Sequence, residues 1–207
     1  MIELRLVQRA RSLYNEVMLV LNTQLQNIPI MSLQSGGSLG MAAEPIIDPR
    51  KLQIVAYHVT GPRIQEPSIL YTSDIREIGP LGLIVDHADR VMTLDEDLVR
   101  LQEVISLNFT LIGKTVFDDQ KKRLGKVIEY TVESETFLIQ KLHLGQSLLK
   151  NIKSSGLLIH RSQIVEVTDK KIIVRSATVQ EQVSLMQAVN PFRKSQALAP
   201  DTKDLVQ

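Results

Sequence analysis

The sequence repeats itself at a distance of 85 residues, and this duplication limits the fold more than any other feature. In that register residues 25–59 align with residues 110–144. The five identities are Leu39 with Leu124, Gly40 with Gly125, Glu44 with Glu129, Ile54 with Ile139 and His58 with His143. An insertion of four residues then shifts the register to 89, where Ser73, Ile75 and Glu77 meet Ser162, Ile164 and Glu166. The chain is therefore expected to contain two tandem copies of one small domain.

Each copy consists of short apolar segments separated by polar turns. In the second copy we expect strands at residues 111–117, 126–133, 137–144, 157–160, 163–168 and 171–176. Asp169-Lys170 in this copy and Pro80-Leu81-Gly82 in the first suit tight hairpin turns at equivalent places. Short strands at spacings of roughly 8 to 12 residues are typical of a small all-β barrel or sandwich. The predicted fold class is mainly β.

The second copy, residues 111–174, resembles a PRC-barrel domain. The resemblance rests on Gly113-Lys114-x-Val116, Leu124-Gly125-Lys126-Val127, the strand at 137–144, Ser162-Gln163-Ile164-x-x-Val167 and Ile172-Ile173-Val174. The first copy keeps Leu39-Gly40, Ser73-Asp74-Ile75 and Ile78-Gly79 but has Ile28-Pro29-Ile30 where the family has Gly-Lys. The resemblance implies two tandem PRC-like β-barrels that make protein contacts, as the carboxy-terminal barrel of bacterial ribosome maturation factors does.

The duplication divides the chain into five segments. They are an N-terminal segment at 1–24, a first barrel at 25–92, a helical connector at 93–108, a second barrel at 109–180 and a flexible polar tail at 181–207. Apolar residues at helical spacing predict a helix within residues 1–24 and another near 95–106, with Thr93 or Asp95 as its N-cap. The first helix either packs on the first barrel or serves as an amphipathic surface for a partner or a membrane.

Composition excludes several classes of protein. The chain has no cysteine, so it has no disulfide, thiol nucleophile or thiolate zinc site. Its longest apolar run, residues 17–21, is far shorter than the roughly 20 residues of a transmembrane helix. Charged residues interrupt any secretory signal near the N-terminus. We therefore expect a cytoplasmic protein.

No catalytic or metal-binding constellation stands out. Gly113-Lys114-Thr115 is similar to the end of a P-loop, but Asn108 occupies the place of the required upstream glycine, and the motif opens a strand. The four histidines lack the spacing that sets two ligands on one helix face. His58 and His143 occupy equivalent positions, which favours a structural role. The sequence predicts no enzyme activity, no cofactor and no metal.

Charge is distributed unevenly between the copies. Residues 25–92 carry 5 basic and 7 acidic groups, whereas residues 109–180 carry 12 basic and 7 acidic groups. The candidate surface for an anionic partner comprises Lys121, Lys122, Arg123, Lys126, Lys150, Lys153, Lys170 and Lys171. Solvated turns explain the same residues without a partner. An acidic protein face or RNA is the rival explanation, although aromatic platforms for RNA bases are scarce in this copy.

The leading hypothesis is a non-enzymatic binding or adaptor protein. The family resemblance implies a protein partner, in ribosome assembly or RNA processing. The alternative is a scaffold for a membrane-associated or cell-division complex, because the same domain occurs in a photosynthetic reaction-centre subunit and in archaeal division adaptors. In that case residues 1–24 provide peripheral membrane contact.

Overall fold

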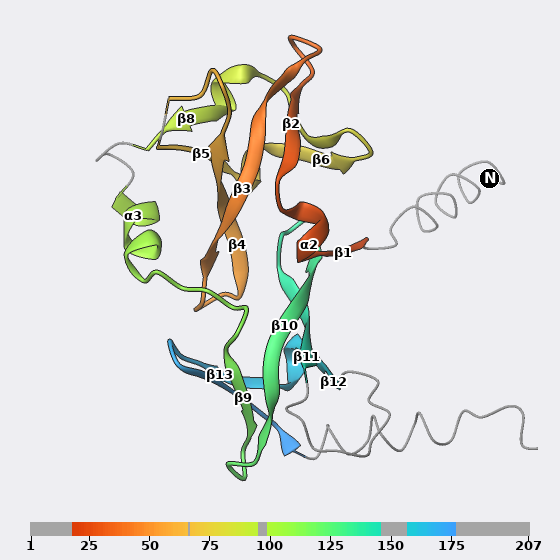
Figure 1. Ribbon diagram of the computed structural model, residues 1–207, viewed down its shortest axis with the longest axis vertical. Coiled ribbons are helices and arrows are strands. Elements are labelled where there is room, and N and C mark those ends of the chain that lie inside the picture. The colour runs from red at the N-terminus through yellow and green to blue at the C-terminus, as the bar shows by residue number, and fades with distance from the viewer. Residues whose placement is uncertain (1–17, 66, 95–98, 146–156, 177–207) are drawn as a thin grey trace, which may run out of the picture. The chain divides into compact units, whose positions relative to one another are not determined.

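The described residues, 18–65, 67–94, 99–145 and 157–176 of a computed structural model, contain two β-sheets and two short α-helices (Figure 1). The first sheet comprises β2 (Ile28–Ser32), β3 (Ser38–Asp48), β4 (Gln53–Thr60), β5 (Ser68–Tyr71), β6 (Ile75–Gly79), β7 (Gly82–Val85) and β8 (Val91–Thr93). The second comprises β1 (Leu19–Leu21), β9 (Thr115–Asp118), β10 (Arg123–Glu133), β11 (Ile139–Gly145), β12 (Leu157–His160), β13 (Ile164–Val167) and β14 (Lys171–Val174). The prediction of a mainly β fold is confirmed.

The two sheets share one strand order. The first runs β5-β4-β3-β2-β7-β6 and the second runs β12-β11-β10-β9-β14-β13, each with a single parallel pair next to its first strand. The bulges coincide as well. Ile75 pairs with Val85 and Glu77 with Ile84, and the partners 89 residues later pair in the same way. The duplication read from the sequence thus extends to the backbone hydrogen bonding.

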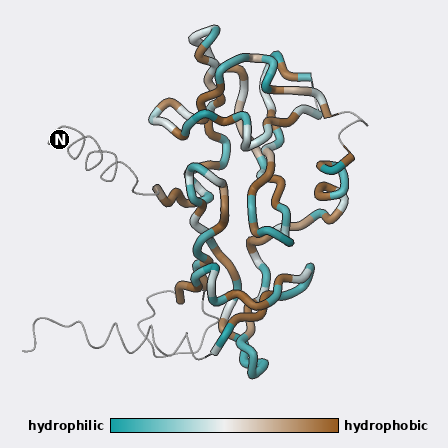
Figure 2. The backbone as a smooth tube through the Cα atoms, turned by 180° about the vertical axis from the view of Figure 1, so that it is seen from behind, coloured by the Kyte–Doolittle hydropathy of each residue, from teal (hydrophilic) through white to brown (hydrophobic). Residues whose placement is uncertain are grey.

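The shared Leu-Gly pair has a packing cause. A Cβ atom on Gly40 would lie 2.7 Å from the carbonyl oxygen of Thr60, and one on Gly125 would lie 2.5 Å from the carbonyl oxygen of Gly145. A real Cβ cannot approach backbone so closely, so a glycine is required at this place in both copies. Elsewhere the strands carry the hydrophobic residues and the turns the hydrophilic ones (Figure 2).

Neither sheet of the described residues closes into a barrel. The first ends in β6 and β8, and the second ends in β12 and β13. In each copy a three-residue 3-10 helix joins two strands: η1 (Thr72–Asp74) joins β5 to β6, and η3 (Arg161–Gln163) joins β12 to β13. At η3 the side-chain oxygen of Gln163 accepts a hydrogen bond from the His160 amide at 2.6 Å, and the Gln163 carbonyl accepts one from the Arg175 amide at 3.0 Å. The described residues therefore form two sheets and show no closed barrel.

The segment before the first copy joins the second sheet. Leu19 pairs with Glu133 and Leu21 with Thr131, antiparallel to the end of β10. Because β9 pairs with only the first part of the eleven-residue β10, the rest of this edge is open to another strand. The helix expected within 1–24 is therefore wrong for Leu19–Leu21, while α2 (Asn22–Leu25) is a single turn and residues 1–17 lie outside the described residues.

The connector contains the expected helix, α3 (Val99–Ser106). Its buried side chains, Leu101 and Val104, pack against Ile46, Ala56 and Ile69 of the first sheet. The predicted start at 95–98 and the predicted tail at 181–207 lie outside the described residues. The described residues up to Arg175 belong to one compact unit, and α3 shares a hydrophobic core with the first sheet.

A backbone bridge joins the two copies. The Ile54 amide donates to the Phe137 carbonyl at 3.0 Å, and the Ile139 amide donates to the Leu52 carbonyl at 2.9 Å. These two bonds are equivalent under the offset of 85 residues, so each copy contributes the same groups. Leu52 and Phe137 also share a positive φ, of 45° and 56°. The junction is therefore locally symmetric, as in a two-fold dimer.

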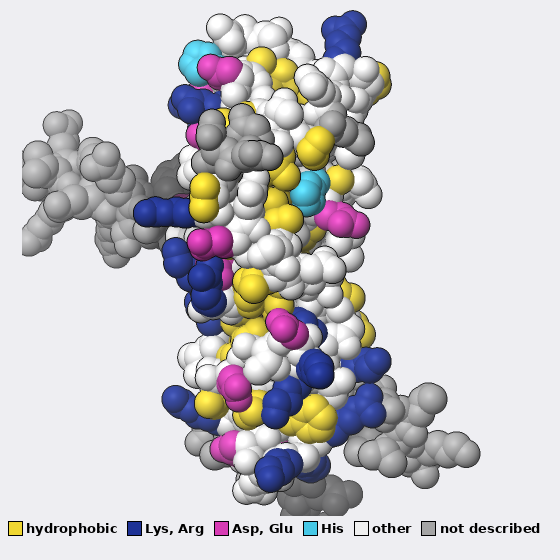
Figure 3. Space-filling model, turned by 90° about the vertical axis from the view of Figure 1, so that its left-hand side faces the viewer, with side chains coloured by type: hydrophobic (Ala, Val, Ile, Leu, Met, Phe, Trp, Pro, Cys, Tyr) yellow, Lys and Arg dark blue, Asp and Glu magenta, His cyan; other side chains and the backbone are white. Residues whose placement is uncertain are grey.

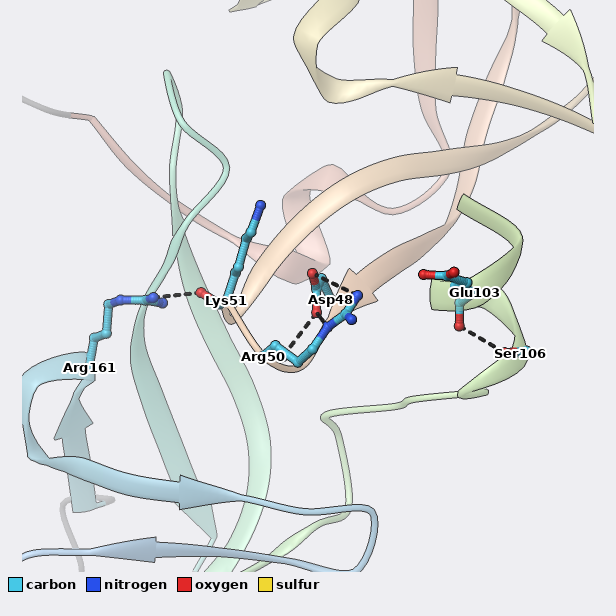
Figure 4. A network of polar contacts seen from close by, with 6 residues as sticks. All are labelled: Asp48, Arg50, Lys51, Glu103, Ser106 and Arg161. Carbon is cyan, nitrogen blue, oxygen red and sulfur yellow. Dashed lines mark hydrogen bonds and ion pairs between the residues drawn. The ribbon is translucent and has the colours of Figure 1, made fainter. Parts of the chain in front are cut away.

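Side chains complete the junction. Arg161 donates to the carbonyl oxygens of Leu52 at 3.0 Å and Lys51 at 2.5 Å (Figure 4). The equivalent residue of the first copy is Thr72, whose hydroxyl donates to the Ile54 carbonyl at 3.0 Å within its own copy. The Phe137 ring meets the Tyr57 ring edge-on at 6.3 Å. Arg161 therefore bonds to the other copy whereas its equivalent Thr72 does not. We call the Arg161 hydrogen bonds to Lys51 and Leu52 the Arg161 clamp.

Replacing Arg161 tests the clamp. We expect Arg161→Ala to lower the free energy of unfolding by about 1–2 kcal/mol, because charge-assisted hydrogen bonds to two backbone carbonyls are lost. Urea denaturation followed by circular dichroism measures this loss. The exposed Arg175→Ala serves as the control and should change stability by less than about 0.5 kcal/mol. Equal losses in both variants would contradict the clamp.

The buried side chains of Tyr57 and Tyr130 should make the stability of the fold depend on pH in the alkaline range. Burial raises the pKa of Tyr57 and Tyr130 above its ordinary value, and the Tyr57 and Tyr130 hydroxyls have no hydrogen-bond partner among the described residues. The folded protein keeps protons that the unfolded chain releases above about pH 10, so their contribution to stability is complete below that pH and declines above it.

The variant Tyr57→Phe removes one of these hydroxyls. We expect it to be as stable as the parent protein at pH 7, or more stable by about 1 kcal/mol, because an unsatisfied buried hydroxyl is lost. Its stability should also decline less between about pH 9 and pH 11. Urea titrations at several pH values measure both effects, and parallel curves for the two proteins would refute the assignment.

Candidate anion-binding face of the second sheet

Three strands of the second sheet place two lysines side by side. Thr115 of β9 pairs with Lys126 of β10 on one side and with Lys171 of β14 on the other. Neighbouring strands lie about 4.8 Å apart, so the Cα atoms of the two lysines are about 10 Å apart. Both lysines are exposed, and Thr115 between them is half-buried.

The next row adds an arginine and two apolar side chains. Phe117 pairs with Arg123 on one side and with Ile173 on the other. Phe117 lies two residues after Thr115, so both rows are on the same face of the sheet. Phe117 and Ile173 are half-buried, whereas Val116 and Ile172 between them point to the opposite face and are fully buried. We call Arg123, Lys126, Lys171, Phe117 and Ile173 the basic face.

The basic face is visible as a mixed surface. Figure 3 shows Lys and Arg side chains around hydrophobic ones on the part of the molecule formed by the second sheet, at the bottom of the view. Exposed Glu166 of β13 pairs with Ile173 and adds one carboxylate at the border. Cations therefore lie beside a small apolar centre.

Local bonds fix the turn between β9 and β10. The buried Asp118 carboxylate accepts hydrogen bonds from the Gln120 amide at 3.0 Å and the Lys122 amide at 2.7 Å. Lys121 has a positive φ of 66° within this turn. Lys121 and Lys122 are consequently held at the end of the hairpin, next to Arg123.

A second turn precedes β14. The Thr168 hydroxyl donates to the Lys171 carbonyl at 3.0 Å and accepts from the Lys171 amide at 3.1 Å. Because β14 runs parallel to β9, Lys170 lies at the opposite end of the strands from Lys121 and Lys122. Of the predicted basic residues, Arg123, Lys126 and Lys171 thus lie on the strands, and the turns at the two ends of these strands carry Lys121, Lys122 and Lys170. The other two, Lys150 and Lys153, lie outside the described residues.

Lys114 has a structural role near this face. Its ammonium donates to the Asp169 carbonyl at 2.5 Å and lies 4.3 Å from the centre of the Phe109 ring. Burial lowers its pKa, and the charge of Asp169 acts in the opposite direction. The Gly113-Lys114-Thr115 motif leads into β9, with no helix N-terminus at which a phosphate would bind.

The first sheet provides an internal comparison. The equivalents of Arg123, Lys126 and Lys171 are Ser38, Met41 and Gly82 under the offsets of 85 and 89 residues. Arg175, the exposed residue after β14, corresponds to Asp86. Equivalent strands therefore carry positive charge in one copy only, and the charge is not a requirement of the fold.

Sequence reasoning missed Phe117 and Ile173. The sequence pattern that could have indicated Ile173 is the alternation of side chains between the two faces of β14. Lys171 and Ile173 share one face, and Ile172 and Val174 share the other. A continuous apolar run of this kind reads equally well as a strand buried on both faces. Pairing with β9 and β10 was needed to assign these residues to the basic face.

The histidines and acidic residues of the described ranges form no metal site. Half-buried His58 in β4 and His143 in β11 occupy equivalent strands. Nowhere in the described ranges do three His, Asp or Glu side chains gather as metal ligands. None of the helices described is long and apolar enough to span a membrane.

Comparison with known proteins adds no assignment. No protein-family model matches the sequence, and a search of curated proteins gives no significant match. The PRC-barrel resemblance stays a prediction based on the residues and motifs given above.

Replacing Asp118 tests the origin of the β9–β10 turn. We expect Asp118→Ala to lower the free energy of unfolding by about 1–2 kcal/mol, because the Gln120 and Lys122 amides lose their acceptor. Asp118→Asn keeps an acceptor oxygen and should lose clearly less. Chemical denaturation compares the two variants, and hydrogen exchange at the Lys122 amide should accelerate in Asp118→Ala. Unchanged exchange at Lys122 would argue against this role of the carboxylate.

Proposed function

We propose that this protein is a non-enzymatic adaptor whose basic face binds an acidic protein partner. The observation that carries the proposal is the grouping of exposed Arg123, Lys126 and Lys171 beside half-buried Phe117 and Ile173. Apolar contact at the centre of an interface supplies affinity, and charges at its border supply orientation and association rate. The face combines both.

A protein partner fits this face better than RNA does. Single-stranded RNA binds to sheets through several exposed aromatic rings on which bases stack. In the second copy Phe109, Tyr130 and Phe137 are buried, and Phe117 is half-buried. One ring makes a poor stacking platform, whereas Arg, Phe and Ile together suit a protein interface.

The family resemblance supplies the cellular setting of the proposal. Ribosome assembly or RNA processing is the expected context, with a ribosomal or assembly protein as the partner. The alternative, a scaffold for a membrane-associated or cell-division complex, depends on residues 1–24. Of these, residues 1–17 lie outside the described residues, and Leu19–Leu21 pair with β10.

Affinity purification of the tagged full-length chain with mass spectrometry tests the proposal. The test variant is Lys126→Glu with Lys171→Glu, and the control is Arg63→Glu with Arg76→Glu, two exposed residues of the first copy. Both variants change the net charge equally. We expect the test variant to recover its acidic partner at least about tenfold less than the control does, because opposed charges are replaced by like charges.

Two outcomes would overturn the proposal. One is equal partner recovery by test and control variants. The other is recovery that disappears on ribonuclease treatment, which would identify RNA as the ligand. Partner recovery should also fall as salt rises from about 0.1 M to 0.5 M, since exposed charges are screened over about 10 Å or less in this range.

A further inference from the structure

A separate hollow of about 640 Å³ lies between α3 and the turn that joins β3 to β4. Its lining includes the cations Arg50, Lys51 and Arg100. Its apolar residues are Val55, Leu101 and Val104. Binding sites for small molecules usually have volumes of about 300–1,000 Å³ and combine an apolar wall with a few polar groups. The hollow has the size and the composition of such a site.

One cation of the hollow is already neutralised. Arg50 donates from Nε to an Asp48 carboxylate oxygen at 3.0 Å, and the Arg50 amide donates to the same oxygen at 3.0 Å (Figure 4). The Asp48 side chain is 6% exposed and the Arg50 side chain 63% exposed. The hydrogen bond to Asp48 and then the Asp48 charge raise the pKa of Arg50, burial lowers it, and the Glu103 charge adds a smaller increase. Asp48 is therefore satisfied within the turn.

The other two cations are not matched in this way. Lys51 and Arg100 are exposed, and neither makes an ion pair within the described ranges. After the Asp48–Arg50 pair is set aside, the charged residues left in the lining are two cations, Lys51 and Arg100, and one carboxylate, Glu103. The free charge of the hollow is therefore positive.

Half-buried Tyr71 adds a hydrogen-bond donor. Its pKa is raised, first by burial and then by the charge of Asp74, so the phenol is neutral at physiological pH. A neutral phenol donates a hydrogen bond to an oxygen of a ligand. The hollow thus offers two cations and one donor beside three aliphatic side chains.

We propose that this hollow binds a small ligand with one anionic group and an apolar body. Lys51 and Arg100 hold the anionic group, a phosphate or a carboxylate, and Val55, Leu101 and Val104 contact the apolar body. Guanidinium and ammonium groups are the usual protein partners of both anions. The site lies between the first copy and the connector helix α3 and shares no residue with the basic face.

The ligand site adjoins the bridge between the copies. The carbonyl of Lys51 accepts from Arg161, and the carbonyl of the next residue, Leu52, accepts from Ile139. A ligand that orders the Lys51 side chain also restrains this turn. Because such a ligand binds the folded chain, it raises the unfolding temperature as its concentration increases.

Nuclear magnetic resonance with the full-length chain tests the site, using phenyl phosphate and benzoate as probes. We expect saturable shifts of the amide signals of Lys51, Leu101 and Val104 with both. Inorganic phosphate and phenol, which each lack one half of the proposed ligand, should bind at least about tenfold more weakly. The ratio of the two probe affinities identifies the preferred anion, phosphate or carboxylate.

Variants make the test specific. Lys51→Gln with Arg100→Gln should weaken phenyl phosphate binding at least about tenfold, whereas Arg63→Gln with Arg76→Gln should leave it unchanged. Unfolding temperatures confirm that each variant is folded, and Arg100→Gln alone replaces the double variant if that one is not. Equal affinity of test and control variants, or no saturable shift up to about 10 mM probe, would overturn the proposal. Partner recovery through the basic face is unaffected by either result.

Discussion

Two backbone hydrogen bonds between the turns at 52–54 and 137–139 hold the copies in register, and the rest of the structure depends on them. The bonds require positive φ at Leu52 and Phe137, which ordinary side chains adopt only when their surroundings compensate the strain. The ring of Phe137 against Tyr57 and the Arg161 clamp provide that compensation, because they bury the turn and bind its carbonyl groups. The two equivalent backbone bonds and the side chains of Phe137, Tyr57 and Arg161 together join the two copies into one unit.

The copies also depend on each other through the segments that precede them. The segment before the first copy forms β1 on the second sheet, and the segment before the second copy forms α3 on the first sheet. Without β1 the end of β10 would expose an unpaired edge, and without α3 Ile46 and Ile69 would lose their apolar cover. Each sheet is therefore completed by chain that lies outside its own repeat.

The sequence alone predicted the register of the duplication, the mainly β fold and six of the described basic residues, because short-range patterns carry these features. The Leu-Gly pairs were informative because Gly40 and Gly125 face backbone oxygens at distances that exclude a side chain. The strand Leu19–Leu21 could not be predicted, because its partner edge at Thr131–Glu133 is more than 100 residues away. The expected barrel closure is not seen among the described residues, because the end strands of neither sheet pair with each other, and such pairing leaves no periodic signal in the sequence. Phe117 and Ile173 became recognisable as part of the candidate site only through strand pairing.

The confinement of the basic face to one copy has a consequence for stoichiometry. In a homodimer of single repeats every surface residue occurs twice, so a binding face would be bivalent and could cross-link its partners. Here Ser38, Met41 and Gly82 occupy the equivalent places in the other copy. Under the proposed function, each chain therefore offers one such face and is expected to bind one partner molecule through it.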